Sequence, residues 1–305
     1  MKATYFMRNG GPEVLEYGDV PDPVASQGQA LVDVYAASVN AADWKTRSGY
    51  HRPTQSFPYI PGRDFSGVVA ALGDGVTDFK VGDEVFGVSE QTGEKCYAEK
   101  VAINAAILAR KPAGLPHVEA AAVGLIGLTA VVAIEHTLKL AAGETILIQG
   151  GAGGVASFAL QIAKHLGARV ITTTSAANRD YVCSLGADEI IDYNAQDFTK
   201  IVSGCDAVLD TVGGDVAMRS FAVVRPGGRA AFVAGPAPAS PRSDVISLKP
   251  QVGRDRAHLE RVTGLVTSGA VLVPHITTYS LAEAAAAHKV SEGRHFRGKL
   301  VFKVR

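Results

Sequence analysis

Three small residues in the segment ETILIQGGAGGVASFALQIAKHLGARV (residues 144–170) have the spacing needed to hold a dinucleotide. Gly151, Gly153 and Ala156 fit the pattern G-x-G-x-x-G/A, which here follows an apolar strand pattern and opens a helical one. Gly151 allows a tight turn, Gly153 lets the backbone approach a pyrophosphate, and Ala156 lets the helix pack closely on the strand. The N-terminus of that helix then binds the anion. The pattern predicts a dinucleotide site, and the alternative is a glycine-rich connection that holds no ligand.

The end of the following strand indicates which dinucleotide is bound. Enzymes that use NAD place an Asp or Glu about 20 residues after the first glycine, where it bonds the ribose 2′-hydroxyl. Residues 174–177 of this chain (TSAA) contain no acid. Ser175, Asn178 and Arg179 instead offer hydrogen-bond donors, and a guanidinium suits a 2′-phosphate. We therefore expect NADPH rather than NADH, the alternative being that Arg179 merely lies on a solvated helix start.

The elements that hold these residues alternate between strand and helix from about Pro112 onward. Helices are predicted at 156–166 and 179–186, and short apolar strands at 144–149, 168–174, 189–193, 205–210 and 228–235. This alternation is typical of βαβ units, whose connections are right-handed and whose strands form a doubly wound parallel sheet. The fold class is therefore α/β, with a Rossmann-like sheet over this part of the chain.

Residues 1–110 have a different pattern, rich in short β-strands. Apolar and β-branched runs at 30–39, 67–73 and 84–88 are separated by Gly, Pro and Asp, which predicts a compact antiparallel barrel. The last apolar run, KLVFKV (299–304), is similar to these strands and is expected to return to them. We therefore predict two domains, one formed by 1–115 and 272–305 and the other, 116–271, inserted into it.

Composition excludes several classes of partner. Thirty basic and thirty acidic residues cancel, so neither nucleic acid nor an anionic membrane surface is an expected partner. The apolar stretch 118–134 is too short and too rich in glycine for a membrane span and predicts a buried helix. Three widely spaced cysteines and an N-terminus without a secretory apolar region favour a cytoplasmic location. No hydrolase elbow or P-loop is found.

With these features in view, the chain resembles the medium-chain dehydrogenase/reductase superfamily, in its zinc-free quinone oxidoreductase (zeta-crystallin-like) branch. The matching stretches run in family order from end to end: SVNAADWKTRSG (38–49), PYIPGRDFSGVV (58–69), VGDEVFG (81–87), GLTA (127–130), GGAGGVAS (150–157), SLGADEIIDY (184–193), DTVGG (210–214) and HFRGKLVF (295–302). The resemblance implies a GroES-like antiparallel β-barrel catalytic domain beside the Rossmann-like domain. It also implies a homodimer or homotetramer.

The resemblance assigns site residues by position. The substrate-cleft candidates are Asn40, Tyr50 and Arg63. The residues expected to bind the cofactor are Asn40, Thr129, Gly151, Ala152, Gly153, Gly154, Val155, Ser175, Asn178, Arg179, Tyr193, Val233, Gly235, Arg297, Gly298 and Lys299. Two have simpler alternatives, because Asn40 could cap a turn and Tyr193 could be an ordinary aromatic at the end of a strand.

No metal site is expected, because the residues that bind catalytic zinc in related dehydrogenases are replaced. Arg63 stands where those enzymes have a ligating histidine, and a guanidinium does not bind a metal. Arg63 and Asp64 are expected to form a structural ion pair that fixes their turn, with contact between Arg63 and a substrate oxyanion as the sharper alternative. Loops around 44–60 and 236–260 are expected to shape the substrate pocket.

The hypothesis is a zinc-independent oxidoreductase that transfers hydride from NADPH to a small-molecule electron acceptor. Quinones and α,β-unsaturated carbonyls are favoured, because they delocalise the charge that hydride brings and need no Lewis acid. Two alternatives stay open: an enoyl-thioester reductase of the same superfamily, and a non-catalytic NADPH-binding sensor or structural protein.

Overall fold

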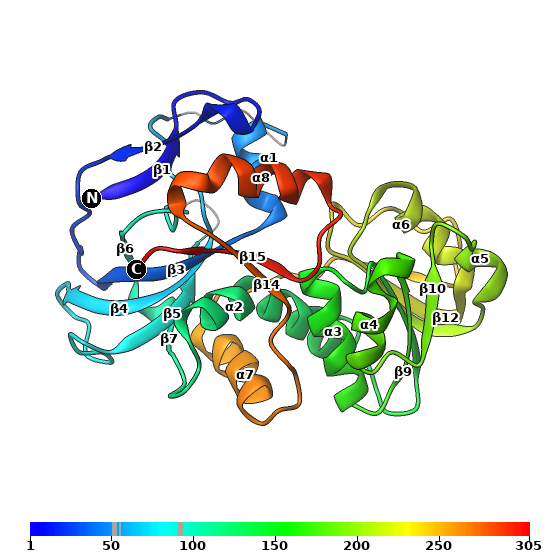
Figure 1. Cartoon of the computed structure of the whole chain (residues 1–305). Coiled ribbons are helices and arrows are strands. Elements are labelled where there is room, and N and C mark those ends of the chain that lie inside the picture. The colour runs from blue at the N-terminus through cyan, green and yellow to red at the C-terminus, as the bar shows by residue number, and fades with distance from the viewer. Residues whose placement is uncertain (51–53, 55, 91–93) are drawn as a thin grey trace. The chain divides into compact units, whose positions relative to one another are not determined.

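The computed structural model describes the chain except for residues 51–53, 55 and 91–93 (Figure 1). Part of the loop 44–60, expected to shape a substrate pocket, therefore lies outside the described residues. The chain divides into two compact units. The first unit consists of Met1–Leu125, Arg254–Thr263 and His275–Arg305, and the second of Ile126–Gly253 and Gly264–Pro274.

The first unit is built on a seven-stranded sheet in the order β14-β15-β3-β4-β5-β7, with β6 also paired to β3. The strands are β3 (Gln29–Val39), β4 (Asp64–Leu72), β5 (Glu84–Val88), β6 (Lys100–Asn104), β7 (Leu108–Arg110), β14 (Ile276–Tyr279) and β15 (Lys299–Lys303). A separate hairpin is formed by β1 (Lys2–Phe6) and β2 (Leu15–Asp19), and the helices α1 (Ala41–Ser48) and α8 (Ala284–Gly293) belong to the same unit.

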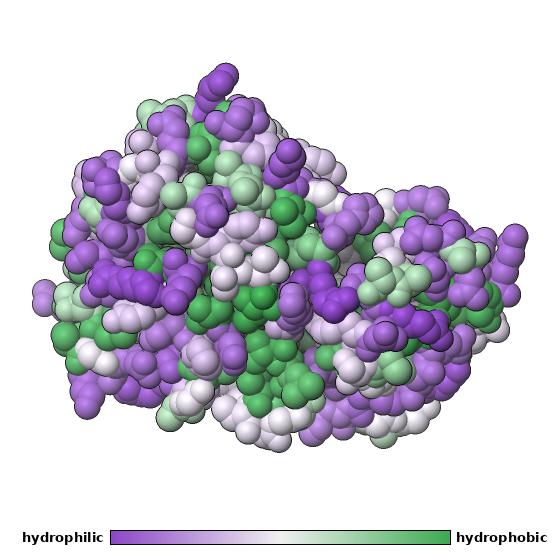
Figure 2. All heavy atoms as spheres, viewed as in Figure 1, coloured by the Kyte–Doolittle hydropathy of each residue, from purple (hydrophilic) through white to green (hydrophobic). Residues whose placement is uncertain are grey.

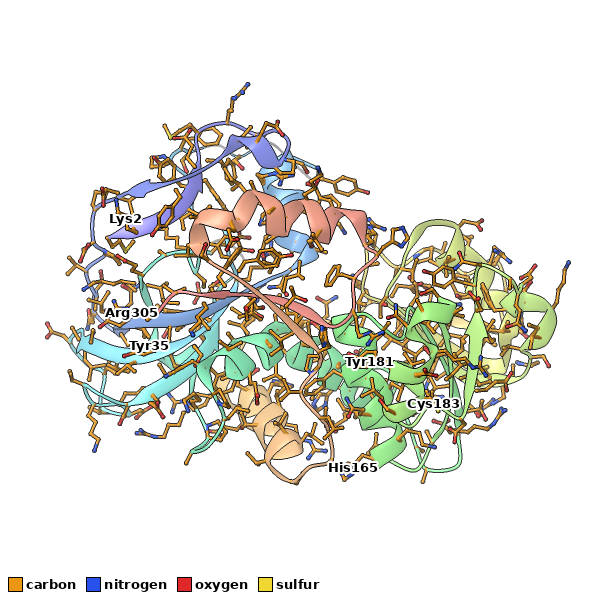
Figure 3. The ribbon with its side chains drawn as sticks, in the orientation of Figure 1. Lys2, Tyr35, His165, Tyr181, Cys183 and Arg305 are labelled. Atoms are coloured by element: carbon orange, nitrogen blue, oxygen red, sulfur yellow. The ribbon has the colours of Figure 1, made fainter. Side chains whose placement is uncertain are left out.

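The last strand of the chain lies inside this sheet. β15 pairs antiparallel with β3, placing Leu300 opposite Val39, and pairs parallel with β14. The expected return of the last strand to the N-terminal β region is thus confirmed. The sheet is antiparallel in its other pairs, so the parallel β14–β15 pair departs from the purely antiparallel barrel predicted. Beyond β15, the Arg305 guanidinium lies 5.9 Å from the Tyr35 ring centroid (Figure 3).

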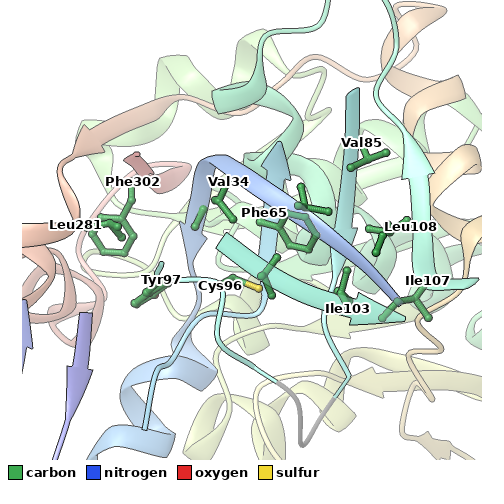
Figure 4. Close-up of a cluster of buried hydrophobic side chains, with 14 of the residues drawn as sticks. Val34, Phe65, Val85, Cys96, Tyr97, Ile103, Ile107, Leu108, Leu281 and Phe302 are labelled. Atoms are coloured by element: carbon green, nitrogen blue, oxygen red, sulfur yellow. The ribbon is translucent and has the colours of Figure 1, made fainter. Parts of the chain in front are cut away.

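The core of the first unit follows from the alternation of side chains along its strands. Val32 and Val34 on β3 point to the same face and are fully buried, as a period of two requires. They pack in one cluster with Phe65 from β4, Phe302 from β15 and the buried aromatic Tyr97 (Figure 4). This cluster fixes the ends of β3 and β4, where the polar residues described below begin.

The second unit is a six-stranded, fully parallel sheet in the order β10-β9-β8-β11-β12-β13. Its strands are β8 (Thr145–Gln149), β9 (Arg169–Thr174), β10 (Glu189–Asp192), β11 (Cys205–Asp210), β12 (Val224–Phe232) and β13 (Ile246–Leu248). Its helices include α3 (Gly154–His165), α4 (Arg179–Ser184), α5 (Phe198–Ile201) and α6 (Gly214–Ser220). The order reverses between β8 and β11, so the predicted doubly wound sheet is confirmed and ligands are expected at the carboxyl ends of its strands.

The long apolar stretch forms α2 (His117–Val131), which continues as a π-helical turn over Val132–Thr137. By length and composition this helix could cross a membrane, but 72% of its most apolar window is buried inside the protein, as in a core helix. The predicted buried helix is confirmed. Among the described residues the other helix is α7 (Arg256–Thr267), and single 3-10 turns lie at Pro12–Val14, Ala105–Ile107, Ala176–Asn178, Phe221–Val223 and Leu281–Glu283. Hydrophilic and hydrophobic residues are mixed on the face drawn in Figure 2.

Candidate active site

The glycine loop connects β8 to α3 and leaves the helix N-terminus open. Gly150 adopts φ +78°, the N–H of Gly151 donates to the Thr173 carbonyl oxygen (2.9 Å), and that of Gly153 donates to the Gly150 oxygen (2.9 Å). Gly153 is the N-cap of α3, and no side chain caps the helix. The first N–H groups of α3 are therefore available to an anion, and the helix dipole favours negative charge there.

The loop also needs its glycines for close packing. A Cβ atom on Gly151 would lie 2.3 Å from Oγ1 of Thr172, which is held in place by a 2.7 Å hydrogen bond to the Ile148 carbonyl oxygen. A Cβ on Gly153 would lie 3.3 Å from the Gly150 oxygen. Ala156 is fully buried. The loop that includes Gly151, Ala152, Gly153, Gly154 and Val155 thus has the backbone that fits a pyrophosphate.

The residues expected around a 2′-phosphate meet at the ends of two neighbouring strands. Thr174 and Asp192 are paired at the carboxyl ends of β9 and β10. Ser175 follows β9 and Tyr193 follows β10, and the N–H of Tyr193 donates to the Thr174 oxygen (3.1 Å). Tyr193 is 48% exposed.

Asn178 and Arg179 lie beside these two residues. The side-chain amide of Asn178 donates to Oγ of Ser175 (3.4 Å), and Nη1 of Arg179 donates to the Ile190 carbonyl oxygen (3.2 Å). Arg179 is exposed. The structure therefore brings together the four residues predicted to hold a phosphate.

Three other predicted residues belong to the second unit. Val233 and Gly235 are half-buried just beyond β12, and the N–H of Val233 donates to the Asp210 oxygen (3.0 Å). Thr129 is half-buried on α2. Sequence reasoning missed Lys249, whose ammonium donates to the Gly235 carbonyl oxygen (2.6 Å) and whose pKa is lowered by burial. This bond fixes the backbone at a predicted cofactor position.

In the first unit, Asp64 is the centre of a buried polar cluster where β3 ends and β4 begins. Its Oδ1 accepts hydrogen bonds from Oγ of Ser38 (2.6 Å) and from the side-chain amide of Asn40 (2.8 Å). Its Oδ2 accepts from the N–H of Leu125 (3.0 Å). Asp64, Ser38 and Asn40 are all buried. The carboxylate therefore joins two strands to the start of α1 and to α2.

Lys299 completes the cluster from β15. Only 3% exposed, it donates from Nζ to the Val39 carbonyl oxygen (2.6 Å) and to Oδ1 of Asn40 (2.7 Å). Burial lowers the pKa of Lys299, while the nearby Asp64 and Asp43 carboxylates act to raise it. Both ends of the Asn40 amide are thus engaged within this unit, and its contact with a nicotinamide remains a prediction.

The predicted ion pair between Arg63 and Asp64 is wrong. Nη2 of Arg63 lies 2.7 Å from Oε1 of Glu94, and its Nε lies 3.8 Å from Oδ1 of Asp43. Successive side chains on an extended segment point to opposite faces, so neighbours such as Arg63 and Asp64 do not meet. The other oxygen of the Glu94 carboxylate accepts a 2.7 Å hydrogen bond from the Tyr59 hydroxyl.

A buried chain of hydrogen bonds leads away from Asp43. Its Oδ2 accepts from the Asn40 N–H (2.8 Å) and from the Tyr97 hydroxyl (2.8 Å). Burial raises the pKa of Asp43 to about 7, against the effect of Arg63 and aided by Glu94.

The chain continues from Tyr97 to His288 and Arg47. Nε2 of His288 lies 3.4 Å from the Tyr97 hydroxyl, and Nδ1 lies 3.2 Å from Nη1 of Arg47. Because arginine only donates, Nδ1 accepts and the ring proton lies on Nε2. Burial and the Arg47 charge lower the pKa of His288 to about 3.

The remaining predicted residues have varied surroundings. Tyr50 is 67% exposed, and its ring meets that of Trp44 edge-on at 6.3 Å between centroids. Arg297 is half-buried. Gly298 has φ +68° and packs directly on the backbone of His275, which gives it a structural role whatever it contacts besides.

Comparison with known proteins identifies the family of this chain. Residues 26–142 match the alcohol dehydrogenase GroES-like domain, and residues 185–302 match a zinc-binding dehydrogenase family. The NADPH-dependent alkenal/one oxidoreductase of Arabidopsis thaliana chloroplasts is 32% identical over 99% of this chain and 79% of its own length.

Two solved quinone oxidoreductases share the fold. That of Coxiella burnetii is 34% identical, with a TM-score of 0.92 over 100% of this chain and 99% of the other. That of Escherichia coli, solved with NADPH, is 26% identical, with a TM-score of 0.91 over 100% of both chains. This chain is a medium-chain dehydrogenase/reductase of the quinone oxidoreductase branch. The resemblance drawn from the sequence, and the GroES-like and Rossmann-type fold that it implied, are confirmed.

The described residues offer no set of ligands for a catalytic zinc, although one matching family is named for zinc. No group of three or more His, Cys, Asp or Glu side chains suited to a metal occurs among the described residues. Arg63 instead places a cation among the carboxylates of Asp43 and Glu94. Cys96 is buried and its thiol pKa is raised well above the usual value, whereas Cys183 is exposed on α4 (Figure 3).

The pKa of Asp43 is raised and the pKa of His288 is lowered. These opposite shifts predict how the stability of the fold changes with pH. Between pH 3.8 and about 7 the folded state alone keeps the Asp43 proton, so stability falls as pH rises. Between about pH 3 and 6.5 the unfolded state alone protonates His288, so stability rises with pH. The two slopes oppose each other in the wild type.

Replacing one residue at a time separates the contributions of Asp43 and His288 to this pH dependence. Relative to the wild type, the urea midpoint of His288→Gln should decrease as pH rises from about 4 to 7, whereas that of Asp43→Asn should increase with pH up to about 6.5. Urea unfolding at a series of pH values measures both. Two variant profiles that run parallel to the wild-type profile would contradict the assignment.

Proposed function

We propose that this chain is a zinc-independent, NADPH-dependent oxidoreductase that transfers hydride to quinones or α,β-unsaturated carbonyls. One observation carries the proposal: an uncapped helix N-terminus behind a close-packed glycine loop, with phosphate donors at the ends of the next two strands. The names of its relatives, a chloroplast alkenal/one oxidoreductase and bacterial quinone oxidoreductases, support the acceptor classes.

The chain's own residues divide the binding of NADPH between two places on the second unit. The loop Gly151–Val155 and the start of α3 would hold the pyrophosphate. Ser175, Asn178 and Arg179 would hold the 2′-phosphate, which the guanidinium recognises by shape and charge. When bound, the cofactor supplies a hydride. The protein then has to orient the acceptor and keep water away from it.

The first unit supplies fixed polar groups rather than a metal. Asn40 is held on both sides by Asp64 and Lys299, and Arg63 is held by Glu94, so neither side chain has to reorganise on binding. We propose that Asn40, Tyr50 and Arg63 face the acceptor. Such preorganised groups suit an acceptor that spreads charge over a conjugated carbonyl.

Stopped-flow absorbance tests the function directly. Loss of the NADPH signal should follow mixing with a benzoquinone or with a short alkenal, and should be much slower with a saturated aldehyde. The saturated aldehyde is the control, because it lacks the conjugation that replaces a Lewis acid. Enzyme that binds NADPH but reduces neither conjugated acceptor would refute the proposal.

Arg179→Glu tests the preference for NADPH. Reversing this charge should raise the Kd for NADPH about 10- to 100-fold, because a charge-assisted contact is lost and a repulsion is added, and should change the Kd for NADH little. Fluorescence titration of both nucleotides measures the effect. Arg169→Glu is the matched control, since Arg169 begins β9, the strand that precedes Arg179, is 52% exposed and pairs with Glu189. Equal losses for both nucleotides in Arg179→Glu would exclude a 2′-phosphate contact.

Location and assembly are separate proposals. We propose a cytoplasmic protein that forms a homodimer or homotetramer through an edge of the parallel sheet. Light scattering during gel filtration measures the mass, and a monomer of 31.8 kDa would exclude the assembly.

A further inference from the structure

Arg254 is a half-buried cation that forms no ion pair with a carboxylate among the described residues. It lies in the first unit, just before α7. Its Nη1 donates to the carbonyl oxygen of Ser89, and its Nε is buried without a hydrogen-bond partner in the described part of the chain. Burial and the charge of Arg63 lower the pKa of Arg254, whereas the carboxylates of Glu94 and Asp64 act to raise it. A guanidinium in such a place is costly unless something pairs with it.

Arg63 is linked to Arg254 through the backbone of Ser89. The Ser89 N–H donates to the main-chain carbonyl oxygen of Arg63 (2.6 Å), and the Ser89 carbonyl oxygen accepts from Nη1 of Arg254. The Arg63 guanidinium is also near enough for its charge to act on that of Arg254. Nε of Arg63 is also buried and makes no hydrogen bond to any described residue. The carboxylate oxygen that faces it, Oδ1 of Asp43, is 3.8 Å away and is itself without a hydrogen bond there. Two donors on two arginines thus remain to be satisfied.

The carboxylates nearby are already engaged. Glu94 is bonded to Arg63 and to the Tyr59 hydroxyl. Asp64 accepts from two side chains and one backbone N–H, and lies near the buried ammonium of Lys299.

The balance of charge therefore depends on Asp43, whose pKa of about 7 lets it hold a proton near neutral pH. With that proton in place, Arg63, Arg254 and Lys299 face only two negative charges. One positive charge is then left over.

We propose that Arg63 and Arg254 form a subsite for a carboxylate carried by the acceptor. The planar guanidinium matches a carboxylate in geometry and charge, and binding one would satisfy both unpaired Nε donors. The inference rests on the proposed function and narrows its substrate class to conjugated carbonyl compounds or quinones that bear an acidic group. The acid is recognised, and the hydride still goes to the conjugated carbon.

Binding of saturated product analogues tests the subsite without turnover. Calorimetry with NADP-loaded enzyme would compare levulinate, a keto acid, with its methyl ester. The wild type should bind the acid about 10- to 100-fold more tightly than the ester, as expected for a charge-assisted contact. Arg254→Gln should bring this acid-to-ester ratio close to one, and Arg254→Lys should keep part of it.

Controls separate recognition from folding. Arg305→Gln removes a cation from the same unit that already pairs with Asp33, and should leave the ratio unchanged. Thermal melting of each variant reports folding, and the lysine variant keeps the test decisive if the glutamine variant melts early. Equal binding of acid and ester by the wild type would overturn the subsite, as would a ratio that survives in Arg254→Gln.

Measuring turnover tests the carboxylate subsite and the proposed hydride-transfer function separately. β-Acetylacrylate, the unsaturated counterpart of levulinate, should be reduced with a higher kcat/KM than its methyl ester. If neither compound is reduced while the binding preference and its loss in Arg254→Gln persist, the hydride-transfer function fails and the carboxylate subsite is supported.

Discussion

Gly298→Ala is expected to lower the free energy of unfolding by about 3 kcal/mol or more, from left-handed strain together with overpacking. Gly298 has φ +68°, and a Cβ atom there would lie 2.0 Å from the carbonyl oxygen of His275. That oxygen is backbone at the entry to β14 and accepts a 2.8 Å hydrogen bond from the Lys299 N–H. Relief of the clash therefore requires β14 and β15 to separate where they begin.

Urea unfolding measures this loss, and the chain offers a close control. Gly293 ends α8 without a positive φ, and a Cβ atom added to it would have nothing within 4 Å. Gly293→Ala should therefore change stability by less than about 0.5 kcal/mol. A similar small change in Gly298→Ala would show that the strand pair adjusts freely, contrary to the packing described.

Asp64→Ala is expected to lower the free energy of unfolding by about 3–5 kcal/mol, the usual cost of removing one partner from a buried charged cluster. The substitution leaves Ser38, Asn40 and the Leu125 N–H without their acceptor. It also removes the negative charge near the buried ammonium of Lys299. Each unpaired buried donor adds its own desolvation cost.

Urea or thermal unfolding measures the effect, and a variant at an exposed carboxylate of the same unit serves as the control. Asp19, 78% exposed, pairs with Lys2 on the surface hairpin, so Asp19→Ala should lower stability far less than Asp64→Ala. A loss in Asp64→Ala no larger than in Asp19→Ala would mean that water replaces the missing carboxylate. In that case the cluster would not hold β3, β4 and α1 together.

Much of the fold can be predicted because its signals are local. The strand expected at 84–88 coincides with β5, and the alternation of strands and helices predicts the parallel sheet. The strand predicted at 67–73 begins earlier, at Asp64. Its first residues include Asp64 and Ser66, which are buried because distant partners satisfy them. An apolar pattern does not reveal such partners.

The residues of the candidate site also fall into those that the sequence predicts and those that it does not. The cofactor loop can be found because its residues are neighbours in sequence and in space. The charged cluster cannot, because Arg63 meets Glu94 and Arg47 meets His288, 241 positions away. The wrong pairing of Arg63 with Asp64 has the same origin, since adjacency along the chain does not imply contact. Arg254 has no sequence signal at all, because only the fold brings it to Ser89.

The place of β15 in the first sheet has a consequence for synthesis on the ribosome. Lys299, which bonds the end of β3, is made 260 residues after Val39, and at about 5–20 residues per second this takes more than ten seconds. The second unit is complete at Pro274, before β15 exists. The inserted unit can therefore fold first, while the backbone groups on the edge of β3 that pairs with β15 are still unpaired. Nascent chains that end before residue 299 should be the form of this protein that most needs a chaperone.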